Sequence, residues 1–273
     1  MNNPIVKESF REDMLPHIWC SGCGNGILMH CIVRAIAKNK LDKNKVCVVS
    51  GIGCSSRATG YLDFNTIHTT HGRAIAVATG IKMAQEDLEV IVITGDGDAT
   101  AIGGNHFIHA CRRNMDITVV VFNNNIYGMT GGQYSPTTPE NDYATTAPYG
   151  NIDQSFDIPE LAKAAGATFV ARGTTYYTDK TTELISRGLK HRGLAIIECI
   201  STCPVYYGRK NKKGSAVSML EWQKENSIDK KAAEGMTPEQ LEGKLIVGEL
   251  FETNIPSYNE QYNKVIARSK EGL

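Results

Sequence analysis

The stretch that decides the fold is VIVITGDGDATAIGGNHFIHACRRNMDITVVVFNNNIYGMTGGQ, residues 90–133. Its apolar, β-branched runs at residues 90–94 and 117–122 predict two strands that are buried on both faces. Between them, residues 101–114 have the length of a helix and contain no proline. A strand–helix–strand unit makes its two strands parallel, so this stretch predicts an α/β fold with a parallel sheet.

Each of the two strands ends in a polar cluster, GDGD at residues 95–98 and NNN at residues 123–125. Parallel strands place both clusters at the same carboxyl edge, where ligands bind in such sheets. Asp96 offers a carboxylate and Asn124 an amide oxygen, and the flanking glycines let a ligand approach the backbone. Hard oxygen ligands with room for phosphate oxygens are typical of a magnesium site. The alternative is a surface turn rich in glycine and aspartate, because short motifs also occur by chance.

This part of the sequence resembles the signature of thiamine-diphosphate enzymes, which is a GDG motif, 25 further residues (here 98–122) and then an NN pair. The resemblance implies that Mg²⁺ is bound by the side chains of Asp96 and Asn124 and by the backbone carbonyl of Ile126. The metal would then hold the diphosphate of the cofactor. The strand context, the spacing and the NN pair together favour the cofactor over the surface turn.

The composition excludes several classes of function. Lys+Arg and Asp+Glu both number 29 in 273 residues, and a net charge of zero argues against a nucleic-acid or basic membrane surface. No apolar run reaches membrane-spanning length. The first residues, MNNPIVKESFRED, are polar and do not resemble a secretory signal, so we expect a cytoplasmic protein.

The eight cysteines divide into two groups by their surroundings. In a reducing cytoplasm they are not expected to form disulfides. Cys31 and Cys111 fall in predicted helices and Cys47 and Cys199 in predicted strands, where a free cysteine packs as a small hydrophobic residue. The other four fall in loops at strand or helix ends: Cys20, Cys23, Cys54 and Cys203.

The loop cysteines are candidates for metal binding or redox chemistry. Cys20 and Cys23 have CxxC spacing before a helix predicted at residues 27–37, whose N-terminus is expected to lower the pKa of the thiols. Cys54 and Cys203 follow strands predicted at residues 46–50 and 194–200. From the spacing alone, a [4Fe–4S] cluster, a zinc ion and unliganded thiols all remain open.

A wider set of motifs is similar to one family. The order of these motifs resembles the β subunit of 2-oxoacid:ferredoxin oxidoreductases, most closely the 2-oxoglutarate type. The motifs are WCSGCG, GIGCSS, HTTHGRA, GDGDA, NNNIYGMTGGQ and a late cysteine before GRKN. The match extends over residues 19–214. It implies a doubly wound, mostly parallel sheet of the thiamine-diphosphate-binding type. It also implies that Cys20, Cys23, Cys54 and Cys203 bind a [4Fe–4S] cluster close to the thiamine.

The resemblance also assigns residues to the cofactor pocket. His71, before a helix that is predicted to end near Ala84, is the candidate catalytic residue of this chain; a capping or packing role is the alternative. The residues expected to bind thiamine diphosphate are Ile52, Gly53, Cys54, Ser55, Thr69, Thr70, His71, Gly72, Gly95, Asp96, Gly97, Asp98, Asn124, Gly128, Met129 and Thr130.

The chain is expected to divide near residue 215. Residues 1–215 would form the domain that binds thiamine diphosphate, Mg²⁺ and the cluster. Residues 216–273 have too few apolar residues for their own core, so this extension is expected to pack on a partner subunit or on the domain surface. Residues 134–152 predict a long ordered loop. GRKNKKGS at residues 208–215 is either a solvated basic loop or a dock for coenzyme A phosphates or an acidic ferredoxin.

The activity implied by the resemblance is the reversible, coenzyme A-dependent oxidative decarboxylation of 2-oxoglutarate to succinyl-CoA and CO2. Thiamine carries out the carbon chemistry, and the cluster passes electrons to ferredoxin. In this family the Glu that activates thiamine lies on the α subunit, so the chain is expected to be inactive without that partner. Met129 replaces the Asn of pyruvate-type relatives, but Gly131 lacks the Lys of many 2-oxoglutarate relatives, so pyruvate and branched-chain 2-oxoacids remain alternatives.

Two more distant alternatives stay open. The chain could be half of a cluster-free thiamine-dependent decarboxylase, or a non-catalytic zinc-binding scaffold, because a fold alone does not fix a function. Iron with visible colour would support the cluster, whereas zinc without colour would exclude it.

Overall fold

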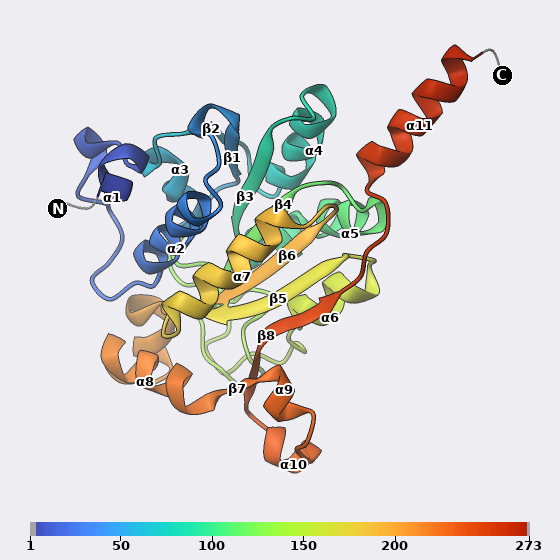
Figure 1. Cartoon of the computed structure of the whole chain (residues 1–273). Helices are drawn as coiled ribbons and strands as arrows, with labels where there is room; N and C mark the ends of the chain where they lie inside the picture. Colours follow the sequence, from blue (N-terminus) through green and yellow to red (C-terminus); the bar gives the residue numbers. More distant parts are fainter. Residues whose placement is uncertain (1–3, 272–273) are drawn as a thin grey trace.

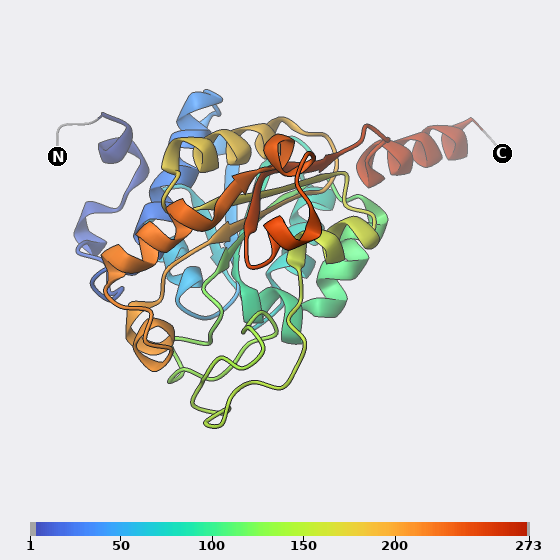
Figure 2. The ribbon, with the colours of Figure 1, turned by 90° about the horizontal axis from the view of Figure 1, so that it is seen from below.

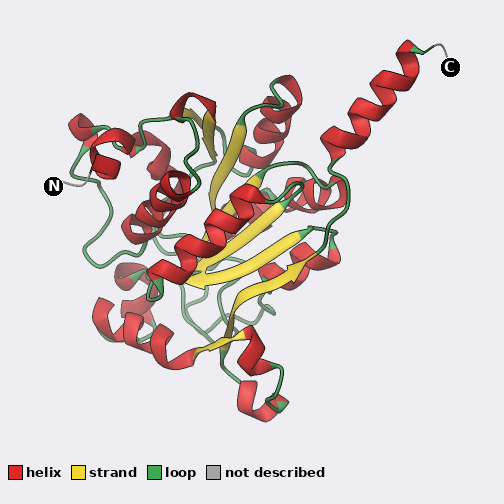
Figure 3. Cartoon of the chain, viewed as in Figure 1, coloured by secondary structure: helices red, strands yellow, loops and turns green. Residues whose placement is uncertain are grey.

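Eight strands form one sheet in the computed structural model, which describes residues 4–271 (Figure 3). The strand order is β2-β1-β3-β4-β6-β5-β8-β7. All neighbours from β2 to β5 are parallel, and β8 joins β5 in the antiparallel sense. The strands are β1 (Val46–Ser50), β2 (Asn65–His68), β3 (Glu89–Gly95), β4 (Thr118–Asn123), β5 (Phe169–Thr174), β6 (Ala195–Ile200), β7 (Ser227–Asp229) and β8 (Leu245–Glu252). The predicted α/β class with a mostly parallel sheet is confirmed.

Helices cover both faces of the sheet because successive side chains of a buried strand point to opposite sides. On one face, Val48 and Ile93 pack with α2 (Asn25–Lys38), α3 (Ala58–Tyr61) and α7 (Thr178–Lys190). On the other, Val49 and Val92 pack with α4 (Ala74–Ala84), α5 (Gly104–Arg113) and α6 (Ile158–Ala164). Figure 1 shows α2 and α7 in front of the sheet and α4, α5 and α6 behind it. The sheet is therefore doubly wound, as predicted.

The predicted strand–helix–strand unit is present as β3, α5 and β4. The register pairs Gly95 with Phe122, so the residues that follow the two strands lie side by side at the carboxyl edge. The helix is shorter than residues 101–114, because a π-helical turn, η4 (Asp98–Ile102), precedes it. Such turns occur mostly as short insertions at functional sites.

The C-terminal extension contributes to the sheet and also leaves the body of the domain. β8 extends the sheet beyond β5, whereas α11 (Tyr258–Lys270) projects away from the other elements (Figures 1 and 2). Whether the extension packs on a partner subunit stays a prediction. The remaining elements are α1 (Pro4–Ser9), η1 (Glu12–Met14), η2 (Lys43–Lys45), η3 (Ser55–Arg57), η5 (Pro204–Gly208), α8 (Ala216–Asn226), α9 (Lys230–Ala233) and α10 (Pro238–Leu241).

The long loop between β4 and α6 is ordered by its own hydrogen bonds. Figure 2 shows it in yellow-green, running along one side of the body. The Thr138 hydroxyl donates to the Asn125 carbonyl oxygen at 2.6 Å, and the Asn151 amide donates to the Thr138 carbonyl oxygen at 2.9 Å. Within residues 4–271, no helix combines the length and the apolar character that crossing a membrane would require.

Candidate functional site

Asp96 is a buried carboxylate held by hydroxyl groups. It follows the last residue of β3, and only 3% of its surface is exposed. The hydroxyls of Ser135 and Thr137 donate to the same oxygen, Oδ2, at 2.5 and 2.7 Å, and the Asn124 backbone N–H also donates to the carboxylate. Burial raises the pKa of the Asp96 carboxyl, and these hydrogen bonds oppose the rise. Oδ1 receives no side-chain hydrogen bond from the described residues.

Asn124 and Ile126 bring two further oxygens toward Asp96. The Ile126 N–H donates to the Asn124 side-chain oxygen at 3.3 Å, which folds the chain tightly after β4, and Asn125 between them is left-handed with φ 61°. Asp96, Asn124 and Ile126 line one cavity. A buried carboxylate without a cationic side chain, beside amide and carbonyl oxygens, fits the hard-oxygen preference of Mg²⁺.

This cavity collects most of the residues predicted to bind the cofactor. Its lining residues are Ile52, Gly53, Cys54, Ser55, His71, Gly95, Asp96, Gly97, Asp98, Ile102, Phe122, Asn124, Ile126, Tyr127, Gly128, Met129 and Thr130. Thr69, Thr70 and Gly72 are not among them. Its volume is about 80 Å³, whereas small-molecule sites usually enclose about 300 Å³ or more, so the chain alone does not enclose a cofactor.

Asp98 connects the loops that carry the other predicted residues. Its Oδ1 accepts from the Gly72 N–H at 2.7 Å, its Oδ2 accepts from the Thr94 hydroxyl at 3.0 Å, and the Ile52 N–H also donates to it. Thr69 is fixed separately, since its N–H donates to the Ser50 carbonyl oxygen at 2.7 Å. Asp98 therefore positions two loops at the edge of the cavity.

The four loop cysteines lie near one another, and one of them, Cys54, lines the same cavity. A Cβ on Gly128 would lie 3.4 Å from Cys54 Sγ and 3.7 Å from Cys203 Sγ, so glycine leaves room beside both sulfurs. The Cys23 thiol is close enough to those of Cys20, Cys54 and Cys203 for each to raise its pKa. Cys20 is exposed and Cys203 is buried. The N-terminal loop and the two strand ends thus converge on one place.

Burial is the main cause of the pKa shifts of three of these thiols. It raises the pKa of Cys23 to about 12 and that of Cys54 to about 11, and it raises the pKa of Cys203 as well. The N-terminus of α2 does lower the pKa of Cys23, as expected, because the Asn25 N–H donates to the thiol. Burial has the larger and opposite effect, so the net shift is upward.

The sulfurs have hydrogen-bond donors that suit the thiolate ligands of an iron–sulfur cluster. Backbone N–H groups donate to three of them, from Asn25 to Cys23, from Met129 to Cys54, and from residues 206 and 207 to Cys203. Hydrogen bonds of this kind tune iron–sulfur clusters held by cysteine thiolates. Among residues 4–271, no three His, Cys, Asp or Glu side chains converge on a position for one metal ion.

The other four cysteines pack in the core, as predicted. Cys31 lies in α2, Cys47 in β1, Cys111 in α5 and Cys199 in β6, and all four are buried. Cys199 is fully buried although it is only four residues from Cys203, so neighbouring cysteines have different surroundings.

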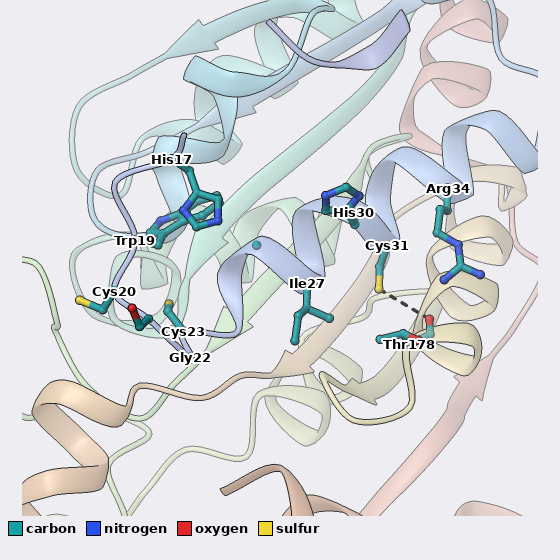
Figure 4. A pocket seen from close by; sticks show the side chains of 12 residues that line it. His17, Trp19, Cys20, Gly22, Cys23, Ile27, His30, Cys31, Arg34 and Thr178 are labelled. Carbon is teal, nitrogen blue, oxygen red and sulfur yellow. Dashed lines mark hydrogen bonds between the residues drawn. The ribbon is translucent and has the colours of Figure 1, made fainter. Parts of the chain in front are cut away.

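A larger cavity, of about 500 Å³, lies along α2 and begins at the CxxC loop. Figure 4 shows Cys20 and Cys23 at one end and Arg34 at the other, with His17 and His30 between them. Its lining residues, all within the described part of the chain, include no Asp or Glu, whereas Asp96 and Asp98 line the smaller cavity. We therefore place the cofactor site at the smaller cavity and treat this one as an open groove beside the cysteines.

Sequence reasoning missed the side chains that hold Asp96. Ser135 and Thr137 lie about 40 residues beyond it, in a loop whose path the sequence pattern does not give. The one available signal was the run SPTT at residues 135–138, where hydroxyls cluster around a proline directly after the glycine-rich segment. Tyr127 was also missed: it lines the cavity and donates from its hydroxyl to the Gly97 carbonyl oxygen at 3.1 Å.

The fold and the site together define a class of protein, the thiamine-diphosphate-binding α/β domains. In agreement, the family model described as "Thiamine pyrophosphate enzyme, C-terminal TPP binding domain" matches residues 51–199. The match begins after β1 and ends in β6, so it includes both polar clusters and excludes the CxxC loop.

Comparison with individual proteins identifies a family within this class. The chain is 53% identical to "2-oxoglutarate synthase subunit KorB" of Methanocaldococcus jannaschii over 98% of this chain and 99% of that protein. It is 52% identical to the subunit of the same name from Methanothermobacter marburgensis, over 93% and 89%. A solved structure, "2-oxoglutarate:ferredoxin oxidoreductase from Magnetococcus marinus with 2-oxoglutarate, coenzyme A and succinyl-CoA bound", aligns with TM-score 0.87 at 33% identity, covering 99% of this chain and 92% of that one. The chain belongs to the KorB family of 2-oxoglutarate synthase subunits, which are oxidoreductase β subunits.

Proposed function

We propose that this chain supplies the thiamine-diphosphate, Mg²⁺ and [4Fe–4S] sites of a 2-oxoglutarate:ferredoxin oxidoreductase. The enzyme would oxidatively decarboxylate 2-oxoglutarate with coenzyme A to succinyl-CoA and CO2, reversibly, and pass electrons to ferredoxin. The observation that carries the proposal is one cavity with Asp96 and Asn124 in its lining and Cys54 at its end. The relative from Magnetococcus marinus, described with 2-oxoglutarate, coenzyme A and succinyl-CoA bound, supports the choice of substrate.

The magnesium site would use Asp96 Oδ1, the Asn124 side-chain oxygen and the Ile126 carbonyl oxygen. Ser135 and Thr137 hold Oδ2, which fixes the orientation of the carboxylate and leaves Oδ1 for the metal. A carboxylate held in this way can bind a cation without first losing rotational freedom. Mg²⁺ keeps open positions for phosphate oxygens, so it would anchor a diphosphate at this edge.

The loops at residues 52–55, 69–72 and 128–130 would surround the cofactor. Bound thiamine diphosphate supplies the carbanion and the electron sink for decarboxylating a 2-oxoacid. The chain's own contribution is position, because Asp98 fixes the first two loops through Ile52 and Gly72. His71 lines the cavity with an exposed side chain, so it can reach a substrate or orient the cofactor.

The cluster would be bound by Cys20, Cys23, Cys54 and Cys203. Such a cluster accepts and releases single electrons at a potential set by hydrogen bonds and solvent exposure. Cys54 and Met129 also line the thiamine cavity, so the electron acceptor would lie beside the site of decarboxylation. All eight cysteines are free, which supports a reducing, cytoplasmic location.

A partner subunit is needed to complete the site. The carboxylates among the described cavity-lining residues are those of Asp96 and Asp98, and hydrogen bonds already engage both. The Glu that activates thiamine would therefore come from the α subunit. The small volume of the cavity supports the same conclusion, since a second chain would have to close over the cofactor.

The test is to reconstitute the chain with its α subunit and any further subunits. We expect a brown complex with close to four irons per chain that reduces a viologen dye with 2-oxoglutarate and coenzyme A. The isolated chain should show no turnover. A colourless zinc protein would favour the scaffold, full activity of the isolated chain would contradict a shared site, and preference for pyruvate or a branched-chain 2-oxoacid would correct the substrate.

A further inference from the structure

We propose that the basic segment, residues 209–213 (RKNKK), is the docking surface for an acidic electron-carrier protein. The inference rests on the proposed function, because it assumes that electrons leave through the cysteine cluster. It goes beyond that function by assigning a surface that touches neither the thiamine cavity nor the core.

Within the described residues, three of the four cations of the basic segment have no carboxylate at ion-pair distance. Arg209, Lys210, Lys212 and Lys213 lie within five residues, and all are exposed. Within residues 4–271, only Lys213 of the four has a carboxylate at ion-pair distance, Asp142 at 3.7 Å. The whole chain has a net charge of zero, so this is a local excess. Such an excess attracts an oppositely charged partner and speeds its association.

The segment lies beside the most exposed cysteine. A Cβ on Gly22, within the CxxC loop, would overlap with the Ala216 side chain, so that loop packs against the start of α8. Ala216 is only three residues beyond Lys213, which limits their Cα separation to about 11 Å. Cys20, in the same loop, is exposed and lies at the end of the open groove in Figure 4. A protein docked on the segment would therefore reach the solvent side of the cluster.

The segment is held rigidly enough to act as a surface. The Asn211 side chain accepts from the Tyr143 N–H at 2.7 Å and donates to the Tyr143 carbonyl oxygen at 3.0 Å. The Tyr207 hydroxyl hydrogen-bonds to Asp142, and the Lys213 ammonium lies 5.7 Å from the Tyr207 ring centre. A backbone held in this way loses little conformational entropy when a partner binds.

Exposed apolar side chains border the same region. On α8, which begins directly after the segment, Val217 is 62% and Trp222 48% exposed, and Ile18, two residues before Cys20, is 65% exposed. An apolar centre with arginine, an aromatic residue and a charged rim is typical of protein interfaces. Recognition of phosphates alone does not require apolar neighbours on both α8 and the chain before Cys20, so the combination favours a protein.

The experiment uses the assembled holoenzyme with the triple variant Arg209→Glu, Lys210→Glu and Lys212→Glu. A ferredoxin with net negative charge and a viologen dye serve as alternative electron acceptors. We expect kcat/KM for the ferredoxin to fall at least about tenfold at low ionic strength. The difference should shrink as salt is added, because salt screens exposed charges. Viologen reduction should be unchanged, since a small dye needs no docking surface.

The matched control reverses three exposed cations at the opposite edge of the sheet, Arg112→Glu, Arg113→Glu and Lys190→Glu, and should leave ferredoxin reduction unchanged. Three results would overturn the proposal. Equal ferredoxin kinetics in both variants would mean that the segment is only solvated. A raised KM for coenzyme A in the viologen assay would assign the segment to the phosphates. Loss of the α subunit on gel filtration would assign it to assembly. Absence of viologen reduction in the unmodified enzyme would refute the proposed function instead.

Discussion

Two aspartates at opposite edges of the same strands, Asp96 buried and Asp116 with a side chain 12% exposed, have different partners. Asp116 precedes β4 at the amino edge, where its Oδ2 lies 3.0 Å from Lys82 Nζ and 3.5 Å from an Arg192 guanidinium nitrogen. Asp96 follows β3 at the carboxyl edge, and its partners in the described chain are the hydroxyls of Ser135 and Thr137 and a backbone N–H.

The two aspartates differ in whether the chain itself supplies a positive charge beside the carboxylate. A buried charge is costly without a counter-charge. Two other carboxylates are paired within the chain: Lys82 pairs with Asp116, and Arg172 lies 2.5 Å from Glu198, which is 2% exposed. Asp96 and Asp98, at the carboxyl edge, have hydroxyl and N–H partners instead. Under the proposed function, a bound cation supplies the counter-charge at Asp96, so the amino edge would serve stability and the carboxyl edge function.

The largest expected effect comes from exchanging the two aspartates for asparagine. Asp96→Asn should abolish turnover and weaken thiamine-diphosphate retention by more than about 100-fold, the upper range for losing even an indirect metal contact. The Tm of the enzyme stripped of metal and cofactor should not fall, because a buried charge without a cation is removed. Calorimetric titration and thermal melts of the assembled enzyme measure both quantities.

Asp116→Asn is the matched control for that substitution. It leaves Lys82 buried without its carboxylate, which should cost roughly 3 kcal/mol of stability, while the folded enzyme retains thiamine diphosphate. If Asp96→Asn destabilises the stripped enzyme as much as Asp116→Asn does, the proposed contrast between the edges is wrong.

The next effect separates the two cysteines at the end of β6. Cys203→Ser should remove most of the iron and the visible colour, because a cluster ligand is lost. Cys199→Ala should keep both and lower stability by about 1 kcal/mol, the usual cost of a small cavity. Iron analysis and absorbance of the purified complex show which of the two cysteines binds the cluster. If only Cys199→Ala loses iron, Cys199 is the cluster ligand and Cys203 is not.

A smaller effect is expected from the hydroxyls that hold Asp96. Thr137→Val removes one donor to Oδ2 and should weaken Mg²⁺ binding by about 10- to 100-fold. Thr137→Ser keeps the donor and should restore most of the affinity. The control is Thr100→Val, because the Thr100 hydroxyl donates to the Asp96 backbone carbonyl oxygen at 2.7 Å rather than to the carboxylate. Equal losses in Thr137→Val and Thr100→Val would show a packing effect instead.

The smallest effect concerns acid sensitivity at the amino edge. Burial lowers the pKa of His191, although Glu252 and Asp116 oppose this. The folded state therefore takes up a proton less readily than the unfolded state, so this residue lowers stability as the pH falls below about 6.5. His191→Gln should flatten that part of the stability–pH curve without changing thiamine retention. A steeper curve for the variant would mean that the pKa is shifted in the other direction.

The sequence predicted the strands and their functional edge because these depend on local patterns. The apolar runs of β1, β3 and β4 lead directly into Gly, Asp or Asn residues, so both these strands and the positions of Asp96, Asn124 and Cys54 at the carboxyl edge could be predicted. β2 was not predicted, because Asn65–His68 has one apolar residue and little burial. It is a strand only because β1 offers an unpaired edge.

The interactions between distant residues could not be predicted in the same way. The placement of Ser135 and Thr137 on Asp96 depends on the path of a long loop, and a hydroxyl in a loop has no periodicity. The convergence of the four cysteines was implied by family resemblance rather than by their spacing. The raised pKa of Cys23 depends on tertiary burial, which local reasoning about a helix N-terminus omits.

The most direct test of the missing counter-charge is a crystal structure of the assembled enzyme with Mn²⁺ and thiamine diphosphate, using anomalous scattering to locate the metal. The account predicts Mn²⁺ bound to Asp96 Oδ1, the Asn124 side-chain oxygen and the Ile126 carbonyl oxygen, with Ser135 and Thr137 still bound to Oδ2. A metal bound elsewhere, with Asp96 outside its coordination sphere, would contradict it.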